Sequence, residues 1–302
     1  MKFECIRGFD LERIAERDWG HQGFDFVKAI LAPAQHAQKK VHLRVGQFFH
    51  TLHSVHKLAE IDEMKPSASD RLIIALDVGT RAEAISLALT LAPFAGWMKI
   101  GLQLFAAEGP DLVRAIRETG ARVFLDLKLH DIPNTIARAV ESVVRLDVQM
   151  LTLHLSGGGE MVRAAVAAAP EDLLLLGITV LTSANSETLR EIGMVEDVSQ
   201  QVVRLAEIGA DCGIGGVVAG AQEIGALRKA VGESLKLVIP GIRPRGSEEH
   251  DQKRIMTPAE AIAAGADYLV IGRPITAAPD PTIAARKILE EIESCVLRTD
   301  CH

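Results

Sequence analysis

Aromatic residues are scarce in this sequence: they make up 4% of the 302 residues, against 48% for hydrophobic residues as a whole. A large core is therefore expected to consist mainly of Ala, Val, Ile and Leu side chains. Cysteine is scarce as well, because Cys5, Cys212, Cys295 and Cys301 are the four present and they form no CxxC pair. This spacing excludes a regular disulfide framework and indicates a reducing compartment.

Long apolar runs are also lacking. No segment approaches the roughly 20 consecutive apolar residues that span a bilayer, so no membrane partner is expected. Residues 1–18 alternate apolar and charged side chains and lack the apolar region of a secretion signal. We expect a cytoplasmic protein.

Positive charge is in deficit, since the formal net charge is -7. This balance argues against nucleic acid as a partner but is compatible with a local basic pocket for one phosphorylated small molecule. No His/Glu cluster has the spacing of a zinc site, and the histidines near the N-terminus are too irregular to indicate one. We predict no metal.

The composition changes near Met64. Residues 1–63 are rich in His and Phe, and a polar linker, Met64–Asp70, then leads into the apolar run Leu72–Asp77. We therefore divide the chain into an extension, 1–63, and a main domain, 64–302. The extension has three interpretations: a helical appendage, a partner-binding segment, or sequence upstream of a translation start at Met64. The third is favoured, because Met64–Asp70 resembles a short native N-terminus.

Strand-like and helix-like segments alternate after the linker, with amphipathic helices expected over Pro110–Thr119 and Ile132–Leu146. Eight such units predict a (β/α)8 TIM barrel with an N-terminal extension. The alternative, an open doubly wound sheet, would favour a glycine fingerprint after the first strand, and Asp77–Arg81 supplies none. The expected strands are Leu72–Asp77, Trp97–Ile100, Val123–Lys128, Met150–His154, Leu174–Leu181, Gly216–Ala219, Leu237–Pro240 and Tyr268–Ile271.

Charged residues interrupt the third expected strand. Asp126 and Lys128 are two apart and share one face of it, and Asp131 follows at its exit. Charges in apolar surroundings are costly unless they pair, and such clusters tune proton donors. We expect Lys128 to remain protonated and to donate a proton; the alternative is a charge-balanced layer of the barrel.

The other candidates also follow strands, where the reactive residues of such barrels lie. Taken alone, Asp77 is more typical of a cap or a surface pair than of function. Lys99 is as compatible with a lysine that extends to solvent as with function. His154 ends the fourth strand as an acid, a ligand or a satisfied barrel residue, of which the last is favoured. Two glycine-rich stretches, Gly157–Gly159 and Gly213–Gly216, are interpreted as a helix start and a strand start.

Glycine and arginine follow the last two strands, in Pro240–Pro244 and Ile271–Ile275. Phosphate binds at this place in many barrels, and Pro274 suits the first turn of a short helix there. The alternative is a pair of tight turns with surface arginines. The long polar connection between Arg243 and Pro258 is either a lid, with Gln252 on the phosphate, or a solvated loop.

The strand-end motifs together resemble orotidine 5'-phosphate decarboxylase of the bacterial type, over about Arg71 to Glu293. The motifs that carry the resemblance are Ala75–Asp77, Lys99–Gly101, Asp126–Thr135, Val180–Ser183, Pro240–Arg243 and Ile271–Arg273. The ten-residue block that begins at Asp126 is the most specific of them.

The resemblance implies decarboxylation of orotidine monophosphate to uridine monophosphate, the last step of pyrimidine nucleotide synthesis, without a cofactor. It implies that Lys128 donates the proton to C6, that Asp126 lies against the substrate carboxylate, and that Lys99 and Asp131 complete an alternating charge array. It also implies a homodimer in which Asp131 and Thr135 come from the partner subunit. The implied substrate contacts are Asp77 to ribose, Thr182 and Ser183 to the pyrimidine, and Gln252, Gly272, Arg273 and nearby Arg243 to phosphate.

Two competing hypotheses differ in class. A relative that acts on phosphorylated sugar acids or ketoses shares an Asp-x-Lys-x-x-Asp signature and uses magnesium, but its pattern favours an acidic ligand at the second strand, where this chain has Lys99. A catalytically silent barrel that binds nucleotides for regulation would have little reason to keep the full charged set.

Overall fold

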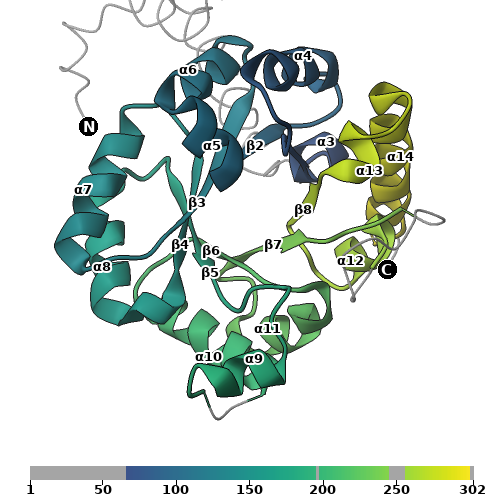
Figure 1. Cartoon of the computed structure of the whole chain (residues 1–302). Helices are drawn as coiled ribbons and strands as arrows, with labels where there is room; N and C mark the ends of the chain where they lie inside the picture. The colour runs from purple at the N-terminus through teal and green to yellow at the C-terminus, as the bar shows by residue number, and fades with distance from the viewer. Residues whose placement is uncertain (1–65, 195–196, 245–255, 300–302) are drawn as a thin grey trace, which may run out of the picture. The chain divides into compact units, whose positions relative to one another are not determined.

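Eight parallel strands form a closed ring in the computed structural model, which describes residues 66–194, 197–244 and 256–299 (Figure 1). β1 pairs with β2 and also with β8, so the ring closes and the predicted TIM barrel is confirmed. The alternative of an open sheet is wrong, because an open sheet would leave β1 and β8 apart. The strands are β1 (Leu72–Ala75), β2 (Trp97–Gly101), β3 (Arg122–Leu129), β4 (Met150–His154), β5 (Leu174–Ile178), β6 (Gly216–Val218), β7 (Lys236–Pro240) and β8 (Tyr268–Ile271).

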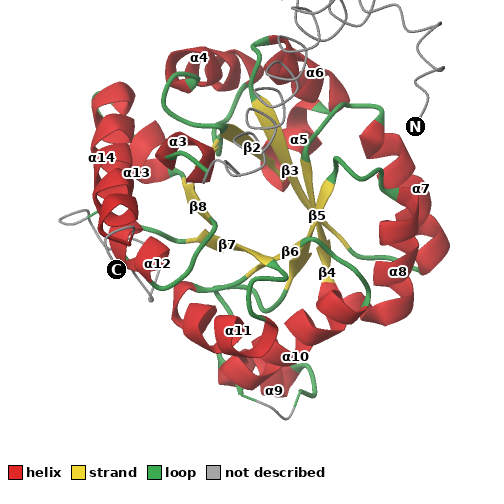
Figure 2. Cartoon of the chain, turned by 180° about the vertical axis from the view of Figure 1, so that it is seen from behind, coloured by secondary structure: helices red, strands yellow, loops and turns green. Residues whose placement is uncertain are grey.

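Helices surround the ring on its outside, as both views along the barrel show (Figures 1 and 2). Pro110 and Pro133 begin two of them, in agreement with the preference of proline for the first helical turn. The α-helices are α3 (Ala68–Arg71), α4 (Arg81–Leu91), α5 (Leu102–Glu108), α6 (Pro110–Glu118), α7 (Pro133–Val144), α8 (Gly158–Ala168), α9 (Ser186–Glu191), α10 (Val198–Asp211), α11 (Ile224–Val231), α12 (Pro258–Ala263), α13 (Arg273–Thr276) and α14 (Pro281–Thr299), with short 3-10 turns at Leu155–Gly157 and Ala221–Glu223.

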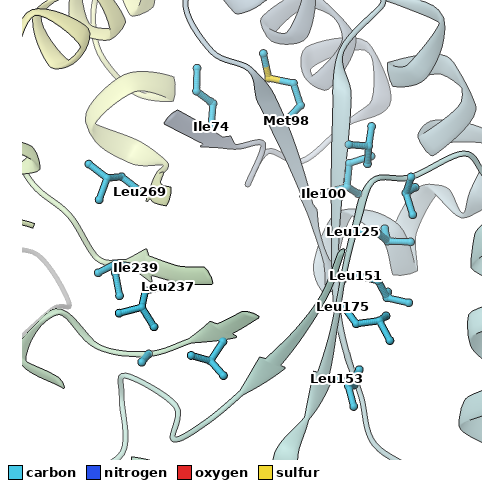
Figure 3. Packing of buried hydrophobic residues seen from close by; sticks show 14 of the residues in the cluster. Ile74, Met98, Ile100, Leu125, Leu151, Leu153, Leu175, Leu237, Ile239 and Leu269 are labelled. Atoms are coloured by element: carbon cyan, nitrogen blue, oxygen red, sulfur yellow. The ribbon is translucent and has the colours of Figure 1, made fainter. Parts of the chain in front are cut away.

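Alternation along each strand creates two apolar layers. Ile73 and Phe124 belong to a cluster inside the barrel, whereas their neighbours Ile74 and Leu125 belong to the larger cluster between strands and helices. Figure 3 shows Ile74, Met98 and Leu125 pointing from the strands toward the helices. Each fully buried Ile or Leu contributes about 1.5–3 kcal/mol of transfer free energy, so the outer layer supplies most of the apolar burial. Inside the barrel, the space near the carboxyl ends of the strands is therefore available to other side chains.

The amino-terminal end of the barrel is closed by a small group of residues that we call the basal cluster: Asp70, Trp97, Arg122 and Tyr268. The Arg122 guanidinium lies 4.1 Å from the centre of the Trp97 ring and donates to Asp70 at 2.5 Å. Trp97 donates its indole N–H to the Asp70 carbonyl at 2.9 Å and packs edge-to-face on Tyr268. These contacts fix the starts of β2, β3 and β8 far from the carboxyl ends of the strands.

Two expected strands end at least two residues earlier than predicted, and the sixth ends one residue earlier, at Val218. The first was expected to reach Asp77 but ends at Ala75, and the fifth was expected to reach Leu181 but ends at Ile178. In both cases the backbone leaves the ladder at the barrel mouth to start a connection, although the apolar run in the sequence continues. The boundary of the extension at residue 63, and its interpretations, lie outside the described residues.

Candidate active site

Four charged side chains meet at the carboxyl ends of the first three strands; we call Asp77, Lys99, Asp126 and Lys128 the charge array. Lys128 donates to Asp126 Oδ2 with an Nζ to oxygen distance of 2.7 Å. Lys99 Nζ lies 3.6 Å from the same Oδ2 atom and 3.1 Å from Asp77 Oδ1. Neighbouring parallel strands place these inward positions side by side, so the array is a direct product of the register.

Asp126 is the centre of the array and the more deeply buried of its two acids, with a side chain 12% exposed against 55% for Asp77. Burial by itself would raise the pKa of Asp126. The charges of Lys99 and Lys128, with hydrogen bonds from Lys128 and Thr152, outweigh burial and hold this pKa below its ordinary value. Asp126 is therefore ionised at neutral pH and holds two ammonium groups at the mouth of the barrel.

Lys128 has an unusual backbone. Its φ is 51°, in the left-handed region that side chains other than glycine rarely adopt. The register between β3 and β4 shifts here, because Leu125 pairs with Leu151 and Leu129 with Leu153. Three residues of β3 therefore lie opposite one residue of β4. Such bulges redirect side chains next to active sites, and this one carries Lys128.

Thr152 is the β4 residue opposite the bulge, and the sequence analysis did not identify it. It is fully buried, accepts the Lys128 backbone N–H at 2.8 Å and donates to Asp126 Oδ1 at 3.0 Å. The sequence did contain a signal, since Thr152 is a polar residue at an inward position of the apolar strand Met150–His154.

A cavity of about 150 Å³ adjoins the charge array. One side is formed by Lys99, Asp126 and Lys128, and Thr182 adds a hydroxyl from the connection after β5. The rest of the wall is apolar, so the cavity combines one charged side with an apolar lining. Its remaining lining residues are Phe124, Ile178, Val180, Leu181, Val218, Ala219, Pro240 and Val270.

The candidate phosphate residues lie at the last two strands. Gly272 precedes α13, and a Cβ placed on it would lie 3.4 Å from Ala75 Cβ and 3.7 Å from Asp77 Oδ2, so this turn closely approaches the end of β1. Arg273 begins α13 and is exposed, and Pro274 lies in its first turn as expected. Arg243 is buried after β7, where its backbone N–H donates to Met256 at 3.1 Å.

Some predicted site residues are not joined to the array within one chain. Asp131 is exposed, its carboxylate accepts the Ile132 N–H at 2.7 Å, and no ion pair links it to Lys99 or Lys128. Thr135, in the first turn of α7, and Ser183, after β5, are exposed too. Gln252 lies outside the described residues, as does most of the proposed lid.

His154 stands at the end of β4 beside the array. Its ring centre is 5.4 Å from that of His130, and burial, with the nearby His130 and Lys128, lowers the pKa of His154. This imidazole is therefore neutral at neutral pH. The two glycine-rich stretches fall as predicted, at the start of α8 and at the start of β6.

Two negative findings concern the described residues alone. In 66–194, 197–244 and 256–299, no three His, Cys, Asp or Glu side chains are grouped as metal ligands, and the absence of a metal stays a prediction. Within those same ranges, no helix combines the length and the apolar character that crossing a bilayer requires.

Comparison with known proteins places this geometry in a family. The sequence profile of the Orotidine 5'-phosphate decarboxylase / HUMPS family matches residues 70–288. The chain belongs to this family. The matched range agrees with the resemblance found from the motifs, which extends over about residues 71–293.

Two curated relatives share about half of their aligned residues with this chain. A protein of Moorella thermoacetica named orotidine 5'-phosphate decarboxylase is 50% identical over 235 residues, which are 75% of this chain and 93% of that protein. One of Opitutus terrae with the same name is 51% identical over 227 residues, 74% of this chain and 98% of that protein. A crystal structure of orotidine 5'-phosphate decarboxylase from Lactobacillus acidophilus is 31% identical with a TM-score of 0.64, covering 74% of this chain and 99% of that one.

Proposed function

We propose that this chain is a carboxy-lyase that converts orotidine 5'-monophosphate to uridine 5'-monophosphate, with Lys128 as the proton donor. Family membership and the curated relatives support the reaction. The single observation that carries the assignment of roles is the position of Lys128: its ammonium is 2.7 Å from a buried carboxylate and lines the cavity.

The difficult step is the loss of carbon dioxide from C6 of the pyrimidine. The bond between C6 and the carboxylate breaks, carbon dioxide leaves, and the electron pair stays on C6 without an adjacent electron sink. A fixed ammonium in a site of low dielectric constant stabilises that developing charge without reorganisation. Lys128 then transfers its proton to C6 and regains one from water.

Asp126 and Lys99 keep that ammonium in place. Asp126 accepts from Lys128, and Lys99 balances the remaining charge of Asp126 and Asp77. Two cations and two acids in alternation allow a second cation near the substrate without an unpaired buried charge. We assign Asp126 to the side of the substrate carboxylate, by analogy with the family.

The residues that contact the rest of the substrate are assigned from their positions in the barrel. We propose that Asp77 binds the ribose, that Thr182 and Ser183 bind the pyrimidine, and that Arg243, Gly272 and Arg273, with Gln252, bind the phosphate. The short approach of Gly272 to Asp77 supports adjacent phosphate and ribose contacts. Binding energy from the phosphate would then help to close the connection that contains Gln252 over the reacting carbon.

We further propose a homodimer in which Asp131 and Thr135 complete the site of the partner subunit. Both are exposed in the single chain, and Ile132 between them is 66% exposed. An exposed carboxylate beside an exposed Ile suits an interface, where the Ile becomes buried and the carboxylate gains a cationic partner. The nucleotide substrate and the free thiols of Cys212 and Cys295 support a cytoplasmic location, which cell fractionation would test.

Ultraviolet absorbance of orotidine 5'-monophosphate tests the assignment. The wild-type chain is expected to turn it over in the presence of a metal chelator, and Lys128→Ala is expected to lose at least about 10³-fold in kcat, since a general acid alone contributes about 10²–10⁴-fold. Lys236→Ala is the matched control, because Lys236 is at the opposite end of the barrel and 50% exposed. It should retain kcat within about twofold.

Three results would contradict the proposal. Chelator-sensitive chemistry on phosphorylated sugars would favour the magnesium-dependent relatives, and nucleotide binding without turnover would favour a regulatory barrel. Normal turnover by Lys128→Ala would reject Lys128 as the proton donor while leaving the reaction itself intact.

A further inference from the structure

Thr152 contacts both Lys128 and Asp126 of the charge array through one oxygen atom. Its Oγ1 accepts the backbone N–H of Lys128 at 2.8 Å and donates to Asp126 Oδ1 at 3.0 Å. The two lysines use the other carboxylate oxygen, Oδ2, at 2.7 Å and 3.6 Å. The carboxylate of Asp126 is thus held from its two sides by different partners.

The two oxygens of the Asp126 carboxylate have different partners, and this difference determines how the carboxylate is oriented. A carboxylate rotates about its last side-chain bond with little intrinsic preference, so its two oxygens are interchangeable unless a neighbour distinguishes them. Thr152 contacts Oδ1 and does not line the cavity, whereas Oδ2 contacts the ammonium groups of Lys99 and Lys128. Thr152 therefore favours the orientation of the Asp126 carboxylate in which Oδ2 faces both cations.

The backbone contact acts on the strained residue. Lys128 has a φ of 51° and lies in the bulge, where three residues of β3 face Thr152 alone. A left-handed conformation at a residue other than glycine costs about 1–2 kcal/mol and persists where the surroundings fix it. The Thr152 hydroxyl, which is fully buried, gives the Lys128 N–H a partner in this conformation.

We propose that Thr152 is a positioning residue for the decarboxylation: it fixes the orientation of the Asp126 carboxylate and the backbone of Lys128 together, so that the Lys128 ammonium meets C6 at the correct place. This inference rests on the proposed role of Lys128. Thr152 does not line the cavity, so we expect it to act through its two neighbours and not through contact with the substrate.

The test removes the Thr152 hydroxyl while it keeps the shape of the side chain. Thr152→Val keeps the volume and removes the hydrogen bonds, whereas Thr152→Ser keeps the hydroxyl. We expect Thr152→Val to lower kcat about 10- to 100-fold, because a misplacement of about 1 Å costs on that order, with KM changed less than about threefold. Thr152→Ser should recover most of the loss.

A second buried threonine provides the control. Thr179, after β5, is 4% exposed and donates its hydroxyl to the Val218 carbonyl at 2.9 Å, with no contact to the array. Thr179→Val removes a comparable buried hydrogen bond and should leave kcat within about twofold. Thermal unfolding of all variants shows how much of any loss comes from stability.

The pH profile distinguishes positioning from a general effect on the fold. Asp126 faces Lys99 from β2, Lys128 from its own strand, and Thr152 and His154 from β4. The Thr152 hydroxyl stabilises the ionised carboxylate, so its removal raises the pKa of Asp126. The acid limb of kcat/KM is therefore expected at higher pH in Thr152→Val than in wild type and Thr152→Ser.

The outcomes separate this inference from the proposed function. Turnover by the wild-type chain tests the reaction, and only then do the variants test Thr152. The proposal is overturned if Thr152→Val keeps kcat within twofold, if the loss appears in KM, if Thr152→Ser or Thr179→Val loses as much, or if the acid limb does not move.

Discussion

At the scale of single residues, the backbone of Gly101 lies close to the charge array and limits the space around it. Gly101, the last residue of β2, has no side chain, and a Cβ built on it would lie 3.0 Å from Lys99 Nζ and 3.2 Å from Asp77 Oδ1. Both distances are shorter than ordinary van der Waals contact, so the ion pair occupies the space that a methyl group would need. Glycine at this position therefore allows Lys99 to reach Asp77.

Gly101→Ala should consequently displace the Lys99 ammonium by a few tenths of an ångström. We expect kcat/KM to fall about tenfold, in keeping with the sensitivity of a preorganised site to small displacements. Stability should stay unchanged or rise by about 0.4–1 kcal/mol, because φ at Gly101 is -88° and alanine restricts the unfolded chain. Steady-state kinetics and urea denaturation measure the two effects.

Gly79→Ala is the control for this change. Gly79 lies just beyond Asp77, and a Cβ at Gly79 has no atom within 4 Å. Its activity should remain within twofold of wild type. A Gly101→Ala enzyme as active as Gly79→Ala would show that the space around Lys99 does not constrain catalysis.

Much of the candidate site could be predicted from residue spacing. Asp126 and Lys128 share a face because they are two apart on a strand, and Asp77 and Lys99 join them because parallel strands end at one rim. Thr152 could not be assigned in this way. Its contacts depend on the shifted register between β3 and β4, and no local pattern in the sequence fixes a bulge between strands 20 residues apart.

At the scale of elements, the two ends of β3 have different roles: the amino-terminal end contributes to stability and the carboxyl-terminal end to the proposed chemistry. Its first residue, Arg122, belongs to the basal cluster, and Lys128 near its other end belongs to the charge array. The interior residue Phe124 lies between them in the inner apolar layer. Changes at the amino-terminal end should therefore alter folding without altering turnover.

Arg122→Gln tests this separation. The substitution removes the stacking on Trp97 and the ion pair with Asp70, so we expect the free energy of unfolding to fall by about 1–2 kcal/mol. kcat should stay within about twofold. Arg114→Gln is the matched control, because Arg114 pairs with exposed Asp111 on α6 and such surface pairs contribute at most about 0.5 kcal/mol. Equal losses in the two variants, or a large fall in kcat for Arg122→Gln, would contradict this division of β3.

Element type was more predictable than element ends. The alternation of apolar runs and amphipathic segments predicted all eight strands of the barrel, because a parallel strand buried on both faces is continuously apolar. The predicted ends of β1 and β5 lie two to three residues beyond the ends in the structure. Apolar residues at a barrel mouth line the cavity instead of continuing the ladder, as Val180 and Leu181 do, and hydropathy does not distinguish these two environments.

At the scale of the whole molecule, the proposed dimer makes each active site a joint product of two chains. Lys128 belongs to the array of one chain, and we propose that Asp131 comes from the other. A subunit with a defective lysine and a subunit with a defective Asp131 therefore carry complementary defects.

Co-refolding Lys128→Ala with Asp131→Asn tests the shared site. Each variant alone is expected to be nearly inactive. In an equal mixture, half of the dimers are mixed and each holds one intact site, so activity should recover to about a quarter of wild type. Lys128→Ala with Asp126→Asn is the control, since both residues lie in one chain and mixing restores no intact site. Recovery in the control, or none in the first mixture, would reject the shared site.

The closed ring limits how two copies can meet. Each of the eight strands described here already has a hydrogen-bonded neighbour on both sides, because β8 returns to β1. None of them offers the unpaired edge by which many proteins extend a sheet from one molecule into the next. In the proposed dimer a second copy would therefore dock through side chains on loops and helices, such as exposed Ile132, and a change in those side chains would alter association without altering the hydrogen bonds of the barrel.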